Sequence, residues 1–503
     1  MPLLFPSISV SNQLQVNSLS LIVIIGVRLS AQPICSFPIT LKQRRIGSIA
    51  MSYYPTSEIV SEQRFGFGPK LGQERYYTLS EQLSRPAFTH SSLKVLPSTQ
   101  SILIKMGEQG TKRNQAKKDP DQMKMVKDQT KQFFRSNYRQ QAEARYQQSI
   151  HTPLGFQERL VQFWSNHFAI SVDNRRLLPL AAHIENDVIR NTWNRNFSEM
   201  LSGVTKHPAM LIYLDNQQSI GPNSKLGKRR GKGLNENLAR EILELHTLGV
   251  GSGYSQRDVL ELAKAISGWG VKLKSPNVGF RFSESAHEPG SVTLLGRRYN
   301  QIGIRQGEQC LADLAVHAST AEHLARKLCL HFLGSEPKEL SADMAQAFVR
   351  SKGQLMPMYK ELIKSKDIHV SSPVRFRTPK EWLFAVVRSV NIELTERQAL
   401  NTLNAMGQPP FKPGSPAGWS DRDSDYNSPS ALTQRMQVAN RLANLAVKSA
   451  KQSNLKPQAL LQDVVNTLYP DALDEHTATA LSKADGVPMK LALLWLSPQF
   501  QYR

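Results

Sequence analysis

Apolar residues recur at helical spacing through most of the chain. Phe156, Leu160 and Phe163 are four and three positions apart, so they form one stripe of a helix. The stripe continues at His167, which is therefore expected to point toward the core. Similar patterns cover residues 178–216, 310–334 and the last eighty residues. These patterns predict a mainly α protein with a large, bundle-like helical domain.

One stretch departs from the helical spacing. Residues 279–299 contain alternating and β-branched positions on both sides of a Pro-Gly pair, which predicts a small β-hairpin. The chain has no Walker loop, no GxGxxG and no HExxH motif. The fold class therefore rests on the helical periodicity, with one hairpin as its β element.

Changes in composition divide the chain into four segments. Residues 51–104 are expected to form an N-terminal helical segment, and residues 151–503 the main helical domain. Between them, residues 105–150 carry eleven Lys/Arg and five Asp/Glu among polar spacers. This composition is typical of a long solvated helix or of a partly disordered segment. A nucleic-acid-binding arm is the weaker alternative, because too few aromatics are present to stack bases.

Two loops stand out within the main domain. The segment 221–233 has five basic residues and no acidic residue, which indicates a solvated loop, with an anion clamp as the alternative. The segment 407–421 is rich in Pro and Gly and carries two aromatic residues, Phe411 and Trp419. We expect it to be a rigid loop that covers a cleft.

The first fifty residues differ from the rest. Ser18–Val27 is apolar but shorter than the roughly 20 residues that span a bilayer. Its first basic residue, Arg28, follows the apolar run, whereas in a signal peptide basic residues precede it. We therefore predict that translation starts at Met51 and that residues 1–50 are a non-native extension. The alternative is an atypical export signal, so the protein is expected in the cytoplasm in the first case and in the periplasm in the second.

The net charge of the chain indicates which classes of partner it attracts. The 503 residues include 63 Lys/Arg and 41 Asp/Glu, a formal charge of +22, which favours encounters with phosphate, anionic polymers or anionic lipids. Only three cysteines occur and no CxxC, so neither a disulfide framework nor a thiolate zinc site is indicated. Cys310 and Cys329 are expected to be buried free thiols.

The densest group of polar residues lies in "GLNENLAREILELHTLGVGSGYSQRDV", residues 233–259. Asn235 is a suitable N-cap, and the Glu236 carboxylate in the first turn complements the helix dipole. Gly249 is a natural helix stop. Ser255 and Asp258 then form an approximate capping box for the next helix. The pattern predicts a helical hairpin whose caps account for part of its polarity.

The remaining charges of this helix are arranged by face. Arg240 lies four residues from both Glu236 and Glu244, so ion pairs are available on either side. Leu243 faces away from the main apolar stripe, which predicts a helix buried most of the way round. Buried carboxylates must be paired, protonated or bound to a metal.

These features define the candidate site residues, with ion pairing to Arg240 as the purely structural alternative. Acid/base catalysis would use carboxylates and an imidazole. The predicted catalytic residues are Glu241, Glu244 and His246. The predicted binding residues are Asn235, Glu236, Arg240, Arg229 and Arg230.

A metal site is a further hypothesis. His167, His246 and His331 lie on helices with apolar stripes, and together they could form a helix-bundle site for a divalent transition metal. No ExxH or HxxxH ligand pair supports it, and a histidine on an apolar face is more often a hydrogen-bonded core residue. Both interpretations stay open.

Several long motifs resemble a known family. They include "RLVQFWSNHFAIS", "HPAMLIYLDN", "RRGKGLNENLAREILELHTLGV", "GYSQRDVLELAKAISGW", "LARKLCLHF" and "GQPPFKPGSPAGW". In their order they resemble the bacterial family called domain of unknown function 1800, over about residues 59–503. Members of that family are often encoded beside proteins of domain of unknown function 1501, and many carry export signals. The resemblance supplies no catalytic residues, and it supports a start at Met51.

Three functions follow as hypotheses. The first is a helical partner or scaffold that acts with a co-encoded protein of domain of unknown function 1501, on anionic polysaccharide or envelope material. The second is an enzyme, metal-dependent, with its site on the Asn235–His246 helix. The third is nucleic-acid binding through the basic segments, which the shortage of aromatics disfavours.

Overall fold

Helices dominate the structure, a computed structural model that describes residues 58–231, 233–274, 276–369, 375–470 and 473–503. Strands occur there only as two short antiparallel pairs, which confirms the predicted mainly α fold with a small β element. Residues 1–50 and Met51 lie outside the described residues. No helix within the described ranges is long and apolar enough to cross a membrane.

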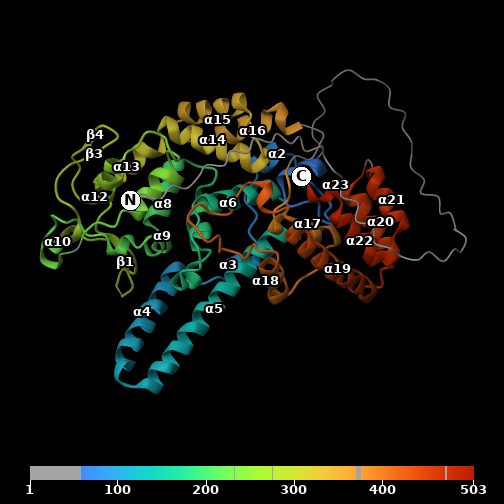
Figure 1. Cartoon of the computed structure of the whole chain (residues 1–503), viewed down its shortest axis with the longest axis horizontal. Helices are drawn as coiled ribbons and strands as arrows, with labels where there is room; N and C mark the ends of the chain where they lie inside the picture. Colours follow the sequence, from blue (N-terminus) through green and yellow to red (C-terminus); the bar gives the residue numbers. More distant parts are fainter. Residues whose placement is uncertain (1–57, 232, 275, 370–374, 471–472) are drawn as a thin grey trace, which may run out of the picture. The chain divides into compact units, whose positions relative to one another are not determined.

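The first helices lead into a long helical hairpin, labelled α4 and α5 in Figure 1. Ser98 and Asp119 cap these two helices by accepting backbone N–H bonds, and Pro120 fits the first turn of α5. The charged segment 105–150 is thus helical, the first of its two predicted forms. The elements are α1 (Glu58–Phe65), α2 (Leu79–Ser84), α3 (Ser91–Lys94), α4 (Thr99–Gln115), η1 (Ala116–Lys118) and α5 (Pro120–His151).

The central helices form most of the larger apolar core. The predicted stripe of α6 is buried, and His167 at its end is 1% exposed. The elements are α6 (Gly155–His167), η2 (Arg175–Leu180), η3 (Ile184–Ile189), α7 (Arg190–Thr192), α8 (Phe197–Lys206), α9 (Pro208–Tyr213), η4 (Asn216–Gln218), α10 (Lys225–Arg230), α11 (Asn237–Glu241), η5 (Ile242–His246) and α12 (Gln256–Ala265).

Two details of this region differ from the sequence predictions. The predicted loop 221–233 contains the short helix α10, because Ser224 caps its start and Gly231, in the left-handed conformation, ends it. The β element is two hairpins: β1 (Trp269–Lys272) pairs with β2 (Gly279–Phe282), and β3 (Val292–Leu294) pairs with β4 (Arg297–Tyr299). The Pro-Gly pair therefore lies between the hairpins, after η6 (Glu284–Ala286), and not at a hairpin turn.

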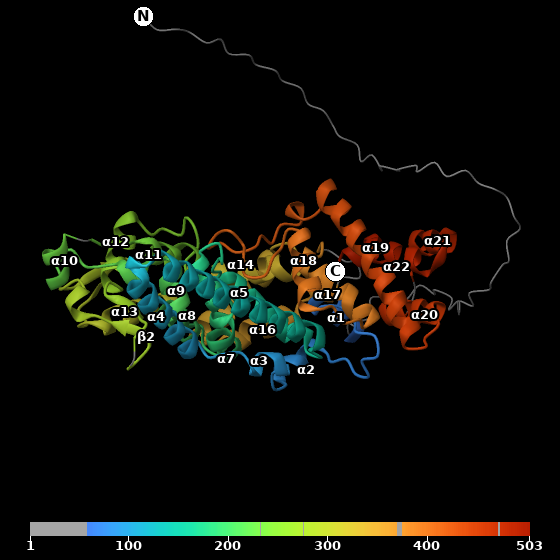
Figure 2. The same cartoon turned by 90° about the horizontal axis from the view of Figure 1, so that it is seen from below.

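The helices of residues 379–501 build a second apolar core, whereas those of residues 304–364 belong to the larger one. Figures 1 and 2 show α19, α20, α21 and α22 side by side. Cys310 and Cys329 are buried thiols that form no disulfide with each other, as predicted. The elements are α13 (Ile304–Ala315), α14 (Ala318–Leu333), α15 (Lys338–Arg350), α16 (Leu355–Lys364), η7 (Lys366–His369), α17 (Pro379–Val390), α18 (Glu396–Ala405), η8 (Asp423–Asp425), α19 (Pro429–Gln452), α20 (Pro457–Leu468), α21 (Glu475–Lys483), α22 (Gly486–Leu496) and α23 (Pro498–Gln501).

A third, small apolar cluster receives the Pro/Gly loop 407–421. Phe411 packs there with Val172, Ala181 and Ala182. The Phe411 carbonyl also accepts a hydrogen bond from the Val172 N–H, at 3.0 Å. The loop is thereby fastened across α5, η2 and the end of α6.

Candidate functional site

The polar helix predicted to be capped at Asn235 begins one residue late and changes form midway. Glu236 is its N-cap position, while the Asn235 Oδ1 accepts a bond from the Asn237 N–H at 3.0 Å. α11 passes directly into η5, a π-helical segment that ends at His246. A π segment widens the turn, so residues after Ile242 no longer follow the 3.6-residue spacing used to sort them into faces.

The charges of α11 and η5 pair with one another near the surface. Arg240 lies 3.2 Å from a Glu236 oxygen and 3.5 Å from a Glu244 oxygen, and all three side chains are between a quarter and two-fifths exposed. The predicted i,i+4 pairs are therefore present. Such exposed pairs contribute at most about 1 kcal/mol each.

Glu241 differs from its neighbours because it has no hydrogen-bond or ion-pair partner among the described residues. Partial burial and the nearby Glu244 carboxylate raise its pKa, while Arg240 opposes the shift. Neither Glu241 nor Glu244 lines any of the cavities described below. Their predicted catalytic role has no surrounding pocket to support it and stays a prediction.

Of the predicted binding arginines, only Arg240 forms ion pairs among the described residues. Arg229 and Arg230 are exposed in the last turn of α10, and neither contacts a carboxylate among the described residues. Asn235 is used by the backbone, since its side-chain amide donates to the Asp215 carbonyl at 3.5 Å. These assignments also stay predictions.

Two of the three predicted metal ligands are neighbours in the core. The rings of His167 and His246 are 6.2 Å apart, and His167 Nε2 lies 3.1 Å from the His246 carbonyl oxygen. His323, which the sequence patterns did not single out, has its ring 6.1 Å from that of His167. Both ring nitrogens of the 1%-exposed His246 lack a hydrogen-bond partner among the described residues.

His331 belongs to a different set of contacts. Its Nδ1 lies 2.9 Å from an Asp421 oxygen, and Arg159 donates toward its Nε2 at 3.2 Å. The Phe163 ring contacts the rings of both His331 and His167. Within the described ranges, no group of three or more His, Cys, Asp or Glu side chains is arranged to hold a metal ion. The metal hypothesis is left without a ligand set.

Burial keeps these histidines neutral. It lowers the pKa of His246 to about 3 and those of His323 and His331 to about 4, and it lowers the pKa of His167 as well. The positive charge of Lys327 lowers the pKa values of His167, His246 and His323 further. The cluster is therefore a set of uncharged polar groups in an apolar core at neutral pH.

The Pro/Gly loop covers a cavity of about 50 Å³, as its sequence predicted for a cleft. Asn166 holds the loop at Trp419: its side chain donates to the Trp419 carbonyl at 2.9 Å and accepts from the Trp419 N–H at 2.7 Å. Gly418 (φ +81°) lies so close to the Asn166 carbonyl that any Cβ there would overlap it. Only glycine fits at that position.

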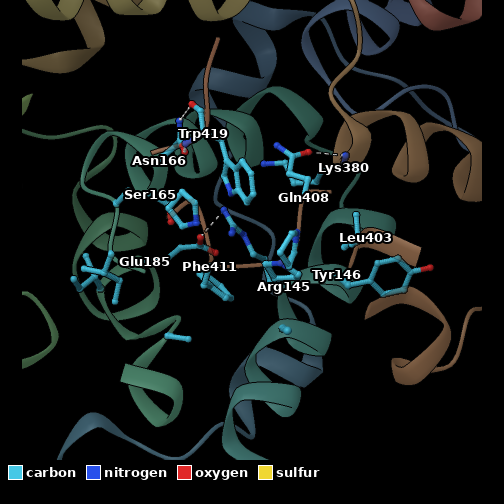
Figure 3. A pocket seen from close by; sticks show the side chains of 18 of the residues that line it. Arg145, Tyr146, Ser165, Asn166, Glu185, Lys380, Leu403, Gln408, Phe411 and Trp419 are labelled. Atoms are coloured by element: carbon cyan, nitrogen blue, oxygen red, sulfur yellow. Dashed lines mark hydrogen bonds and ion pairs between the residues drawn. The ribbon is translucent and has the colours of Figure 1, made fainter. Parts of the chain in front are cut away.

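The walls of this cavity come from residues far apart in the sequence (Figure 3). Helix α5 contributes Arg145 and Tyr146, and α17 contributes Lys380. The end of α6 and η3 provide further polar groups. The remaining lining is largely apolar: Ala142, Phe168, Ala169, Ile170, Ala181, Ile184, Phe384, Leu403, Pro409, Pro410, Phe411, Pro413 and Trp419.

Lys380 is the unusual residue of the cavity. Its backbone N–H donates to the Gln408 Oε1 at 2.8 Å, which ties α17 to the loop. Its Nζ has no hydrogen-bond or ion-pair partner among the described residues. Burial lowers the Lys380 pKa to about 7, and the Arg145 charge acts in the same direction, against Glu381 and Glu185. Lys380 is only partly buried, and its lowered pKa favours the uncharged amine closer to neutral pH than in an ordinary lysine.

Next to Lys380, the carboxylates are fully used by arginines. Arg145 lies 3.0 Å from one Glu185 oxygen, and Arg190 lies 3.1 Å from the other. Arg190 also binds Glu158 with two contacts of 2.6 and 2.8 Å. The Arg145 guanidinium stacks over the Phe411 ring at 4.6 Å. These contacts fix Arg145 and leave no free carboxylate to pair with the amine.

Four N–H donors at the cavity have no hydrogen-bond partner among the described residues: Lys380 Nζ, Gln408 Nε2, Trp419 Nε1 and Arg145 Nε. Two oxygens of the lining, the Tyr146 hydroxyl and the Glu185 oxygen that lies 3.0 Å from Arg145, also lack a hydrogen bond there. Figure 3 shows these four side chains directed to the same space. A ligand that fits this lining must present oxygen acceptors.

The sequence predicted the loop 407–421 that covers this cavity, but not the polar residues that line it. The loop was recognisable from its prolines, glycines and aromatics. Lys380 follows a common helix start, and Arg145 lies within a long charged segment, so neither carries a local signal. Their meeting depends on how α5 and α17 pack.

Comparison with known proteins supports one family. The profile of the family described as "Protein of unknown function (DUF1800)" matches residues 62–502, most of the chain. The chain therefore belongs to this family, which confirms the resemblance predicted from its motifs. No curated protein and no solved structure matches the chain significantly.

Proposed function

We propose that this member of the family is an enzyme that uses the Lys380 amine to attack the carbonyl carbon of a small substrate beneath the 407–421 loop. The observation that carries the proposal is an amine without a partner among the described residues, on the wall of a partly enclosed, mostly apolar cavity. Placing an unpaired ammonium there is costly, so the neutral amine is favoured. A neutral lysine amine is a nucleophile toward carbonyl compounds.

The proposed step balances without a cofactor. The nitrogen lone pair of Lys380 forms a C–N bond with the carbonyl carbon. The carbonyl oxygen takes up both amine protons and leaves as water, so the product is an imine. The apolar walls and the fastened loop limit entry of bulk water, which would hydrolyse the imine.

This proposal develops the enzyme hypothesis with an amine in place of a metal. The predicted site residues Glu241, Glu244 and His246 have no part in it, because they lie outside the cavity. The scaffold hypothesis, with a co-encoded partner of domain of unknown function 1501, remains a prediction.

Reductive trapping tests the proposal. The protein is incubated with acetone and cyanoborohydride at pH 7, and modified lysines are identified by peptide mass spectrometry. We expect Lys380 to be alkylated first, ahead of Lys412 in the same loop, which is 48% exposed and paired with Asp173. Lys380→Arg removes that product, and Lys412→Arg leaves it unchanged. If Lys380 reacts no faster than Lys412, the proposal is wrong.

A second candidate function rests on the α4–α5 hairpin, and concerns binding of an anionic polysaccharide. Ten basic residues there are exposed, and only Arg139 has an ion pair, at 3.9 Å. Four of them share one face of α5 at spacings of three and four residues: Lys124, Lys127, Lys131 and Arg135. Exposed phenyl rings for base stacking are absent from this face among the described residues, which favours a polysaccharide over nucleic acid.

Elution from a heparin column tests this second function. Changing the four stripe residues to Gln is expected to lower the eluting salt concentration markedly. A matched variant changes four exposed lysines elsewhere to Gln: Lys448, Lys451, Lys456 and Lys483. Equal losses in both variants would mean that only net charge matters. Tighter binding to duplex DNA than to heparin would favour the nucleic-acid alternative.

A further inference from the structure

We propose that the substrate of the Lys380 cavity is a small oxo acid, whose carbonyl carbon meets the Lys380 amine and whose carboxylate is held by Arg145, Gln408 and Trp419. This inference rests on the proposed function, because it names the substrate class for the same amine. It comes from the unpartnered groups around the cavity and from the cavity's size.

Among the polar groups of the lining that lack partners in the described part of the chain, N–H donors are more numerous than acceptors. Four N–H donors have no partners among the described residues, and they outnumber the two lining oxygens without a hydrogen bond, those of Tyr146 and of the ion-paired Glu185. A neutral ketone offers one oxygen and would leave most of these donors without a partner. A donor that loses water without gaining a partner destabilises the complex, so a ligand with several acceptor oxygens fits better.

The donors of the cavity are held in fixed positions. Arg145 is held by Glu185 on one side and by the Phe411 ring on the other. Gln408 is 4% exposed and is fixed by its bond to the Lys380 backbone. Trp419 is fixed by the two Asn166 bonds. Donors that are positioned before binding recognise a planar carboxylate with little loss of side-chain entropy.

The volume of the cavity limits the size of the substrate. The cavity measures about 50 Å³, so it admits only a few heavy atoms beyond the space that ordered water would occupy. A carbonyl and a carboxylate on two or three carbons meet that limit. Long-chain or aromatic aldehydes do not, unless the anchored loop opens.

Matched ketones test the inference. Pyruvate and acetone differ only in a carboxylate that replaces one methyl group, so both are used for reductive trapping at pH 9, where Lys380 is neutral. The ratio of their yields at Lys412 corrects for intrinsic reactivity. We expect pyruvate to label Lys380 at a concentration at least tenfold lower than acetone, after that correction.

Arginine variants assign the preference. Arg145→Met is expected to reduce the corrected preference to near one. Arg145→Lys keeps the charge and should retain an intermediate preference. Arg139→Met, on the same helix and 64% exposed, is the matched control and should retain it fully. Circular dichroism and thermal unfolding check that each variant is folded.

The possible outcomes separate the two proposals. Equal corrected labelling of Lys380 by pyruvate and acetone overturns the oxo-acid inference and leaves the amine chemistry standing. Failure of both ketones to label Lys380, with Lys412 labelled, overturns the proposed function itself. A pyruvate preference that survives in Arg145→Met contradicts the assignment of the carboxylate to Arg145.

Discussion

The polar helix at residues 235–246 and the cavity under the 407–421 loop show two opposite uses of charged residues. In α11 and η5, charges are dense in sequence, and Arg240 pairs with both of its glutamate neighbours near the surface. In the cavity, the charged residues are sparse in sequence, yet Lys380 is left without a partner. The comparison teaches that the reactivity of a charged side chain depends on whether it lacks a partner. The number of charged residues near it in the sequence does not decide this.

The same contrast occurs between two consecutive residues of α17. Glu381 accepts bonds from Arg159 at 2.8 Å and from Arg503 at 3.2 Å, and it also completes a capping box with Thr378. These arginines hold its pKa well below the usual range, although burial opposes them. Lys380 beside it has no such partner. A paired buried charge supports the fold, whereas an unpaired one indicates function.

The largest effect is expected from a substitution that disrupts the loop over the cavity. Gly418→Ala places a Cβ against the Asn166 carbonyl in a left-handed conformation, and we expect a loss of about 3 kcal/mol in the free energy of unfolding. Gly414→Ala is the matched control, since its φ is +83° and nothing lies within 4 Å of the added carbon. It should cost only about 1 kcal/mol. Urea unfolding measures both, and equal losses would contradict the packing described at Asn166.

The next effect concerns the cost of the unpaired amine. Since burial lowers the Lys380 pKa from 10.5 to about 7, the unfolded chain binds the extra proton between these values. Wild-type stability should therefore rise with pH across that window, and the cost should be full below pH 7. We expect Lys380→Met to stabilise the protein by about 2 kcal/mol at pH 6 and by little at pH 10.5. A gain that does not change with pH would argue against the lowered pKa.

Neighbouring charges should shift the titration of Lys380 in opposite directions. Glu185→Gln removes a negative charge that raises the Lys380 pKa, so the midpoint of its labelling should fall. Arg145→Gln removes a positive charge and should raise it. Each shift is expected to be about one pH unit or less. Shifts of the same sign in both variants would show that altered packing, rather than charge, controls the amine.

The smallest effect is expected at the polar helix. Arg240→Met removes two exposed ion pairs, so the free energy of unfolding should change by less than about 1 kcal/mol. Acetone labelling of Lys380 should not change. A large loss of stability, or of Lys380 labelling, would indicate that the polar helix takes part in the function of the protein.

Local patterns were sufficient for the helices and their caps. The α6 stripe, the Ser255–Asp258 capping box and the charged pairs of Arg240 all follow from spacing within one helix. The π-helical form of η5 was not predictable, because it depends on the packing of Ile242 and its neighbours. The strand β1 was also missed, since its pairing with β2 is set by the fold and not by its four residues.

The candidate site was predictable only at its cover. Prolines, glycines and two aromatics marked the loop, but Arg145, Glu185 and Lys380 lie in three separate elements of ordinary composition. His323 was missed for the same reason, because its contact with His167 joins α14 to α6. Long-range contacts of this kind leave no periodic signal in a single sequence.

The pH dependence of Lys380 acetylation tests the central claim most directly. Trace labelling with acetic anhydride, followed by peptide mass spectrometry from pH 5 to 11, gives a midpoint for each lysine. The structure predicts a Lys380 midpoint near pH 7, well below the ordinary lysine value of 10.5. A Lys380 midpoint that coincides with that of Lys412 would contradict a buried, unpaired amine and the chemistry built on it.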